Sequence, residues 1–161
     1  MNKDFNEFLE LLNYHKVKYV IVGAHAVGIY SRPRSTGDLD ILIEVTPRNV
    51  ARIVKVLNAF GFGGLGLTID DFLKKDMVIQ LGYEPVRIDI LTSVSGVSWN
   101  EVWKNRVKGI FGSSNIPVCF IGKAQLIKNK KKAGRLQDLA DVKQLEKDKR
   151  LKSKKKNQDK K

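Results

Sequence analysis

The segment Val22-Gly23-Ala24, followed after thirteen residues by Asp38-Leu39-Asp40, decides the fold and the chemistry expected of this chain. The apolar, β-branched run at 18–22 predicts a strand that ends at Gly23, and the run at 39–45 predicts a second strand. The small residues at 24–30 predict a packed helix directly after the glycine. The pattern is therefore a strand, a glycine turn and a helix, followed by a strand with two aspartates at its beginning.

The two aspartates point to cation chemistry. Residues two apart on a strand point to the same face, so Asp38 and Asp40 are predicted to present their carboxylates side by side. Like charges that close repel each other unless a cation lies between them. Hard oxygen ligands at this spacing suit Mg²⁺ or Mn²⁺. An isolated Asp-x-Asp is often only a surface turn, but a charge pair that begins an apolar strand has no packing purpose.

A third aspartate has the same character. The run at 87–91 alternates, so Asp89 faces opposite to Ile88 and Ile90 on a predicted strand. If this strand lies beside the first, Asp89 reaches the same cation site. Two metal ions about 3.5–4 Å apart, held by three carboxylates, can activate an attacking oxygen and neutralise a phosphate transition state.

The glycine at the end of the first strand predicts an anion site. Gly23 opens a helix, where backbone N–H groups and the helix dipole favour an anion such as a triphosphate, and it lets a ligand approach the backbone closely. The alternative is a glycine needed only for a tight turn between strand and helix. The adjacent carboxylate pair favours the phosphate-binding interpretation.

The chain of 161 residues is expected to be one domain at 1–149 with a basic disordered tail at 150–161. The Gly-Phe-Gly-Gly-Leu-Gly run at 61–66 follows a predicted helix, so it is interpreted as a helix C-cap and loop and not as a dinucleotide site. Helices and strands alternate, which is typical of a small α/β domain with a mixed sheet. Further helices are predicted at 3–13, 47–60, from 99, 123–132 and 135–147, and further strands at 77–81, 86–91 and 116–120.

Charge is concentrated near the end of the sequence. Residues 1–122 hold 14 basic and 12 acidic residues, whereas 123–161 hold 16 and 5. A single cysteine, Cys119, excludes an intramolecular disulfide framework and a cysteine zinc site. Neither a signal peptide nor an apolar run of about 18 residues is found, so a cytoplasmic protein without membrane contact is expected.

Taken together, Gly23-Ala24, the run Arg34 to Asp40 and Asp89 resemble the motifs of the polymerase-β-type nucleotidyltransferase superfamily. The chain is most similar to the small bacterial nucleotidyltransferases that resemble the AbiEii toxin and minimal nucleotidyltransferase groups. Those proteins often end in a segment like 126–142 here. The resemblance implies the nucleotidyltransferase fold, a small mixed sheet flanked by helices. It also implies Mg²⁺-dependent transfer of a nucleoside monophosphate from a nucleoside triphosphate to a hydroxyl or phosphate acceptor.

The resemblance also implies roles for single residues. Asp38 and Asp40 hold the metals, and Asp89 holds the catalytic metal and assists deprotonation of the acceptor. Nucleotide binding is expected of Gly23, Ala24, Arg34, Thr36 and Lys130, with a solvated loop or helix face as the alternative for Arg34 and Lys130. Ala24 departs from the usual Ser or Gly, so a hydroxyl contact to the triphosphate is lost while the backbone N–H remains.

Two other classes of function stay open. One is a catalytically weak protein of the same fold that acts by binding, for example as a toxin–antitoxin component, for which Ala24 is the only support. The other is a basic RNA-binding domain in which the acids are incidental, since a lysine-rich segment attracts polyanions by counterion release. The acceptor is expected to be an RNA end, a protein or a small molecule.

Overall fold

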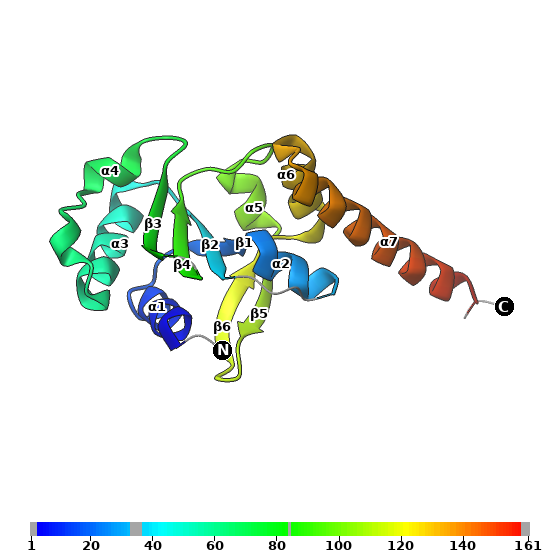
Figure 1. Cartoon of the computed structure of the whole chain (residues 1–161), viewed down its shortest axis with the longest axis horizontal. Coiled ribbons are helices and arrows are strands. Elements are labelled where there is room, and N and C mark those ends of the chain that lie inside the picture. Colours follow the sequence, from blue (N-terminus) through cyan, green and yellow to red (C-terminus); the bar gives the residue numbers. More distant parts are fainter. Residues whose placement is uncertain (1–2, 33–36, 84, 159–161) are drawn as a thin grey trace.

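The computed structural model describes residues 3–32, 37–83 and 85–158, with side chains described as far as Lys147. Its centre is one six-stranded sheet flanked by helices, which confirms the predicted α/β class (Figure 1). The strand order is β3-β4-β2-β1-β6-β5. The strands are β1 (Tyr19–Val22), β2 (Asp38–Ile43), β3 (Val78–Tyr83), β4 (Val86–Leu91), β5 (Val107–Phe111) and β6 (Ile116–Phe120).

The central strands place the predicted site residues next to each other. β2 runs antiparallel to β1 and parallel to β4, so the sheet is mixed. In this register Asp40 lies opposite Asp89 on β4 and opposite Val22 on β1. β1 is buried along its whole length, because its residues are apolar and the strand lies inside the sheet.

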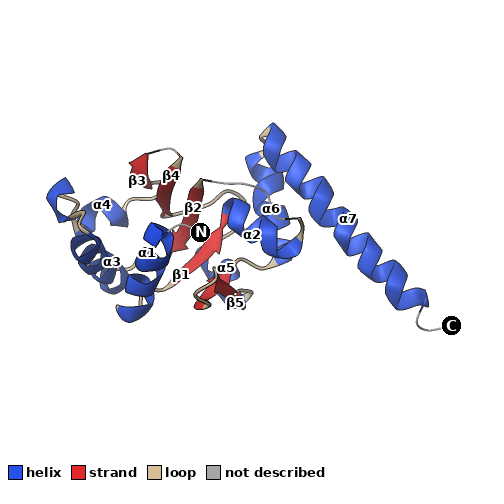
Figure 2. Cartoon of the chain, turned by 60° about the horizontal axis from the view of Figure 1, so that its bottom comes forward, coloured by secondary structure: helices blue, strands red, loops and turns tan. Residues whose placement is uncertain are grey.

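Helices cover the sheet and close the core. α1 (Lys3–Tyr14) buries an apolar face and packs against α3 (Pro47–Phe60). α2 (Gly23–Tyr30) follows β1 directly and contacts both α6 (Lys123–Ala133) and α7 (Leu136–Gln158). In Figure 2, α7 leaves the body of the molecule as a long projecting helix. The shorter helices are α4 (Ile69–Leu73), α5 (Trp99–Lys104) and the 3-10 turn η1 (Gly63–Leu65).

Side-chain caps begin α3 and α5, and a glycine ends α3. The hydroxyl of Thr46 accepts a hydrogen bond from the backbone N–H of Asn49, and a proline opens α3. Gly61 ends α3 in the left-handed region at φ +97°, so the glycine-rich run is a C-cap and loop as predicted. Ser98 accepts from the N–H of Glu101 at the start of α5.

Three elements were not predicted, and one helix extends beyond its predicted end. α4 has only five residues, β5 carries Lys and Gly among its apolar positions, and the 3-10 turn η1 lies within the run predicted to be a loop. The tail expected to be disordered from residue 150 continues α7 as a helix to Gln158. Its Lys, Leu and Gln residues are good helix formers, and neither Gly nor Pro interrupts them. The apolar pattern ends near Lys147, but the helix does not end with it.

Candidate active site

The site is built where the ends of β1, β2 and β4 meet. Parallel pairing of β2 with β4 puts Asp38 opposite Arg87 and Asp40 opposite Asp89. The side chains of Asp38, Asp40 and Asp89 all line one cleft. Sequence alternation therefore predicted their convergence correctly, because the two strands are direct neighbours in the sheet.

Asp40 and Asp89 form a close carboxylate pair. Burial, the charge of Asp89 and a hydrogen bond with that carboxyl raise the pKa of Asp40 to about 7, with a smaller contribution from Asp38. Asp89 is itself buried, with 7% of its surface exposed. Near neutral pH and without a bound cation, the pair therefore holds a proton on Asp40 for part of the time.

The guanidinium of Arg87 bridges the carboxylates of Asp38 and Asp89. Its Nε donates to Oδ1 of Asp89 at 2.8 Å, and its Nη2 donates to Oδ2 of the same residue at 3.1 Å. The same Nη2 donates to Oδ2 of Asp38, also at 3.1 Å. Sequence reasoning did not single out Arg87, although its position two residues before Asp89 places both on one face of β4.

Gly23 is required by the close approach of β2. It adopts φ +69°, a conformation that favours glycine, and a Cβ there would overlap Oδ2 of Asp40. Val22, the N-cap of α2, makes no side-chain capping bond. The glycine therefore serves the carboxylate as well as the turn, and the first N–H groups of α2 are not satisfied by a cap.

The opposite wall of the cleft carries a buried ion cluster between α6 and α7. Nζ of Lys130 lies 3.3 Å from Oδ1 of Asp138 and 2.8 Å from Oδ2 of Asp141. All three side chains are at most 6% exposed. Lys130 lines the cleft, and its ammonium is held by both aspartates.

Arg135 carries charge toward the open side of the cleft. Its Nε donates to Oδ2 of Asp138 at 2.7 Å, while its own side chain is 80% exposed. Burial alone raises the pKa of Asp138, but the hydrogen bonds and charges of Arg135 and Lys130 outweigh burial and lower it. Asp138 is therefore a carboxylate in the first turn of α7 that holds the exposed guanidinium of Arg135 just before this helix.

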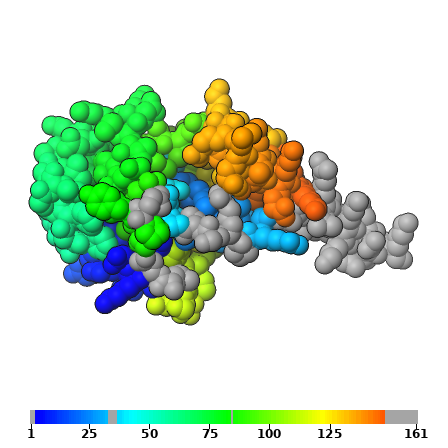
Figure 3. Space-filling view, viewed as in Figure 1, coloured from blue at the N-terminus to red at the C-terminus, as the bar shows by residue number. Residues whose placement is uncertain are grey.

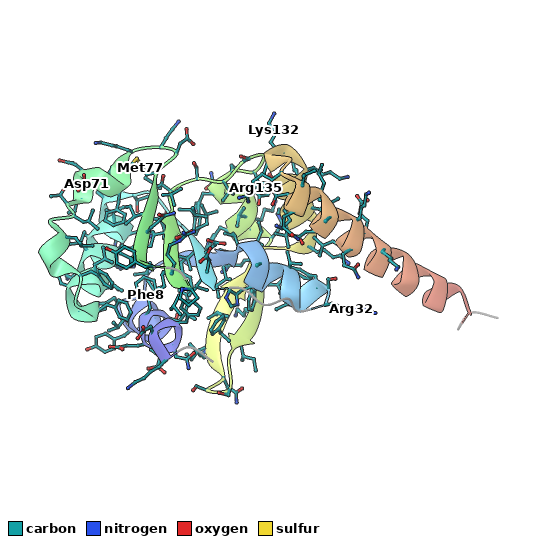
Figure 4. The ribbon with its side chains drawn as sticks, in the orientation of Figure 1. Phe8, Arg32, Asp71, Met77, Lys132 and Arg135 are labelled. Carbon is teal, nitrogen blue, oxygen red and sulfur yellow. The ribbon has the colours of Figure 1, made fainter. Side chains whose placement is uncertain are left out.

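The cleft between these walls has a volume of about 750 Å³, which is within the size range of small-molecule sites. Figure 4 labels a residue from each side of it, Met77 just before β3 and Arg135 between α6 and α7. Figure 3 shows the orange surface of α6 and α7 at one end of the described body and the green surface that includes β3 and β4 beside it. Two hydroxyls, of Ser93 and Ser95, also line the cleft.

The other predicted nucleotide contacts are placed unevenly. Gly23 lines the cleft, and Ala24 lies in the first turn of α2. Arg34 and Thr36 fall outside the described residues. His25 packs between the rings of Phe5 and Phe111, and burial lowers its pKa.

The aspartates of the cleft are the candidate ligands for a metal ion. Within the described ranges, no group of three His, Cys, Asp or Glu side chains is arranged closely enough to hold a metal ion. The donors themselves fit a hard divalent cation, since Asp38, Asp40 and Asp89 supply only carboxylate oxygens to one cleft.

The helices in the described ranges lack the combination of length and apolar character needed to cross a bilayer.

Comparison with known proteins identifies the fold. No family model and no curated protein sequence matches the chain. Among solved structures, it is similar to the lincosamide antibiotic adenylyltransferase LnuA in its lincomycin-bound form, with a TM-score of 0.56 and 15% sequence identity. The match covers 91% of this chain and 96% of that one. The nucleotidyltransferase fold expected from the motifs is thereby confirmed.

Proposed function

We propose that this chain is a nucleotidyltransferase that moves a nucleoside monophosphate from a nucleoside triphosphate to an acceptor hydroxyl or phosphate. The observation that carries the proposal is the convergence of Asp38, Asp40 and Asp89 on one cleft, beside Gly23 at the beginning of α2. Similarity of fold to an adenylyltransferase supports it. The run at 126–142 supports a place near the AbiEii-like and minimal nucleotidyltransferases.

The three aspartates would hold Mg²⁺ or Mn²⁺, which when bound supplies charge neutralisation at the transferred phosphoryl group. The acceptor oxygen forms a bond to the α-phosphorus, and the bond from that phosphorus to the bridging oxygen breaks, so pyrophosphate leaves with the electron pair. The acceptor's proton passes to one carboxylate of the Asp40 and Asp89 pair. We assign the proton-accepting role to Asp89, which the motif resemblance favours.

Triphosphate binding is assigned to groups on both walls. The uncapped N–H groups at the start of α2, at Gly23 and Ala24, face an anion favourably. Arg135 adds an exposed guanidinium that suits phosphate oxygens. Lys130 contributes by fixing Asp138, and through it the position of Arg135. Arg34 and Thr36 keep their predicted roles as nucleotide contacts.

RNA is the acceptor class that the charge distribution favours. Residues 123–161, which include α6 and α7, contain 16 of the 30 lysines and arginines of the chain. α7 begins directly after Arg135, which lines the cleft, and it projects from the body, so a polyanion held along it would reach the site (Figure 1). A partner protein is the second acceptor class to be examined.

The test is transfer of label from each of the four α-³²P nucleoside triphosphates, with Mg²⁺ and cell extract, followed by separation of RNA, protein and small molecules. We expect labelled RNA that ribonuclease removes, and no label with an Asp89→Asn variant of normal melting temperature. Label that resists ribonuclease and yields to protease would assign a protein acceptor. Absence of label in every fraction would contradict an active transferase and favour a binding role.

A further inference from the structure

Arg87 occupies the position that a cation needs between two of the three carboxylates. One nitrogen, Nη2, is shared between Oδ2 of Asp38 and Oδ2 of Asp89, at 3.1 Å from each. A second nitrogen, Nε, holds Oδ1 of Asp89 at 2.8 Å. Arg87 therefore partly neutralises these carboxylates and relieves the repulsion expected among them.

Arg87 holds Asp89 more strongly than it holds Asp38. Asp89 is held at both oxygens by two nitrogens of the guanidinium, the planar two-point geometry that makes arginine–carboxylate pairs strong. Asp38 is held at one oxygen through the shared Nη2, and its side chain is 28% exposed compared with 9% for Asp89. A competing cation would consequently take Asp38 from Arg87 first and leave the contact with Asp89 in place.

Resting on the proposed function, we propose that Arg87 is a positioning residue that competes with the divalent cation for Asp38 and keeps the carboxylate of Asp89 oriented. Cation entry then exchanges the Nη2–Asp38 contact for a metal ligand. Metal binding is thereby made weaker in the empty enzyme than three free carboxylates would allow.

The test is Mn²⁺ binding to the full chain without nucleotide, measured by electron paramagnetic resonance of free Mn²⁺. We expect Arg87→Met to lower the Kd for Mn²⁺ by about tenfold or more, an effect of about 1.4 kcal/mol. Arg87→Lys restores the positive charge, so its Kd for Mn²⁺ should return toward the wild-type value. The kcat of both variants should be lower than that of the wild type, because neither methionine nor lysine can hold both oxygens of Asp89. Arg48→Met, at an exposed position on α3 outside the cleft lining, is the control for the loss of one positive charge.

A Kd for Arg87→Met within twofold of both the wild type and Arg48→Met overturns the inference. Should Arg87→Met fail to fold, the test passes to the wild type with ¹⁵N-labelled arginine. Mg²⁺ should then shift the Nη signal of Arg87 and leave its Nε–H protected from exchange, and an unchanged Nη signal at saturating Mg²⁺ overturns the inference. Failure of the proposed function is a separate result, in which neither the wild type nor Arg87→Met binds Mn²⁺ and the wild type transfers no label.

Discussion

Replacing Lys130 by methionine tests whether this lysine is mainly a buried structural cation or a nucleotide contact. Its ammonium lies 2.8 Å from Asp141 and 3.3 Å from Asp138, with all three side chains almost fully buried. Removing one partner of a buried ion pair costs about 3–5 kcal/mol, because the other charge stays buried. Asp138 keeps Arg135 at 2.7 Å, so the loss falls mostly on Asp141 and should lie near the lower limit.

We therefore expect Lys130→Met to lower the free energy of unfolding by about 3 kcal/mol, or roughly 6–12 °C in Tm for a domain of this size. Urea unfolding followed by circular dichroism measures the change. Lys131→Met is a matched control on the same helix, since Nζ of Lys131 pairs with Glu146 while 57% exposed, and an exposed pair contributes less than about 1 kcal/mol. The double variant Lys130→Met, Asp141→Asn should recover about 1–2 kcal/mol by removing the buried charge.

Equal stability of the Lys130→Met and Lys131→Met variants would refute the reasoning about the buried cluster. A direct contact of Lys130 with the triphosphate predicts a different pattern. Its loss would raise KM for the nucleotide with little effect on unfolding. The two measurements together therefore separate the two roles.

Three further outcomes are expected. Gly23→Ala and Gly61→Ala should each lower the free energy of unfolding by about 1–2 kcal/mol, because both glycines have positive φ. Only Gly23→Ala should abolish transfer, since a Cβ at Gly23 overlaps Asp40 whereas a Cβ at Gly61 meets nothing; equal transfer activity of the two variants would contradict this. In EDTA, the protonated carboxyl of Asp40 stabilises the folded protein fully below pH 4. This stabilisation is lost as the pH rises through about 7, because folding raises the pKa of Asp40 to that value. Asp40→Asn should therefore gain stability relative to the wild type by up to about 4 kcal/mol between pH 4 and 8 in urea titrations; parallel pH profiles would contradict it. Deletion of residues 151–161 should leave Tm unchanged within about 3 °C by calorimetry, because α7 projects from the body there, and a larger fall would show that this segment docks.

Much of the fold could be predicted because each signal was local. Alternation, apolar runs and the glycine-rich C-cap located the core strands and helices, including the end of α3 at Gly61. α4 and β5 lack such signals, since a five-residue helix shows little periodicity and β5 is exposed at most of its positions. The extension of α7 to Gln158 was not predicted, because the prediction followed apolar spacing, which indicates a helix face that packs against the core. The residues after Lys147 have no such face, and their helix propensity alone continues the helix.

The site could be predicted only as far as the spacing of its acids. The pairs Asp38–Asp40 and Asp40–Asp89 follow from strand alternation and from neighbouring strands. The role of Arg87 depends on the register in which β4 pairs with β2, which puts Arg87 opposite Asp38, and that of Arg135 depends on how α7 packs across the cleft. Both are tertiary facts that no local pattern contains.

The measurement that tests the central claim most directly compares α-³²P and γ-³²P nucleoside triphosphates in the presence of Mg²⁺ and acceptor extract. The account predicts that α-label enters the acceptor while γ-label leaves as pyrophosphate. It also predicts that the Asp38→Asn, Asp40→Asn double variant transfers neither, at a normal melting temperature. Transfer of γ-label, or undiminished transfer of α-label by the double variant, would contradict it.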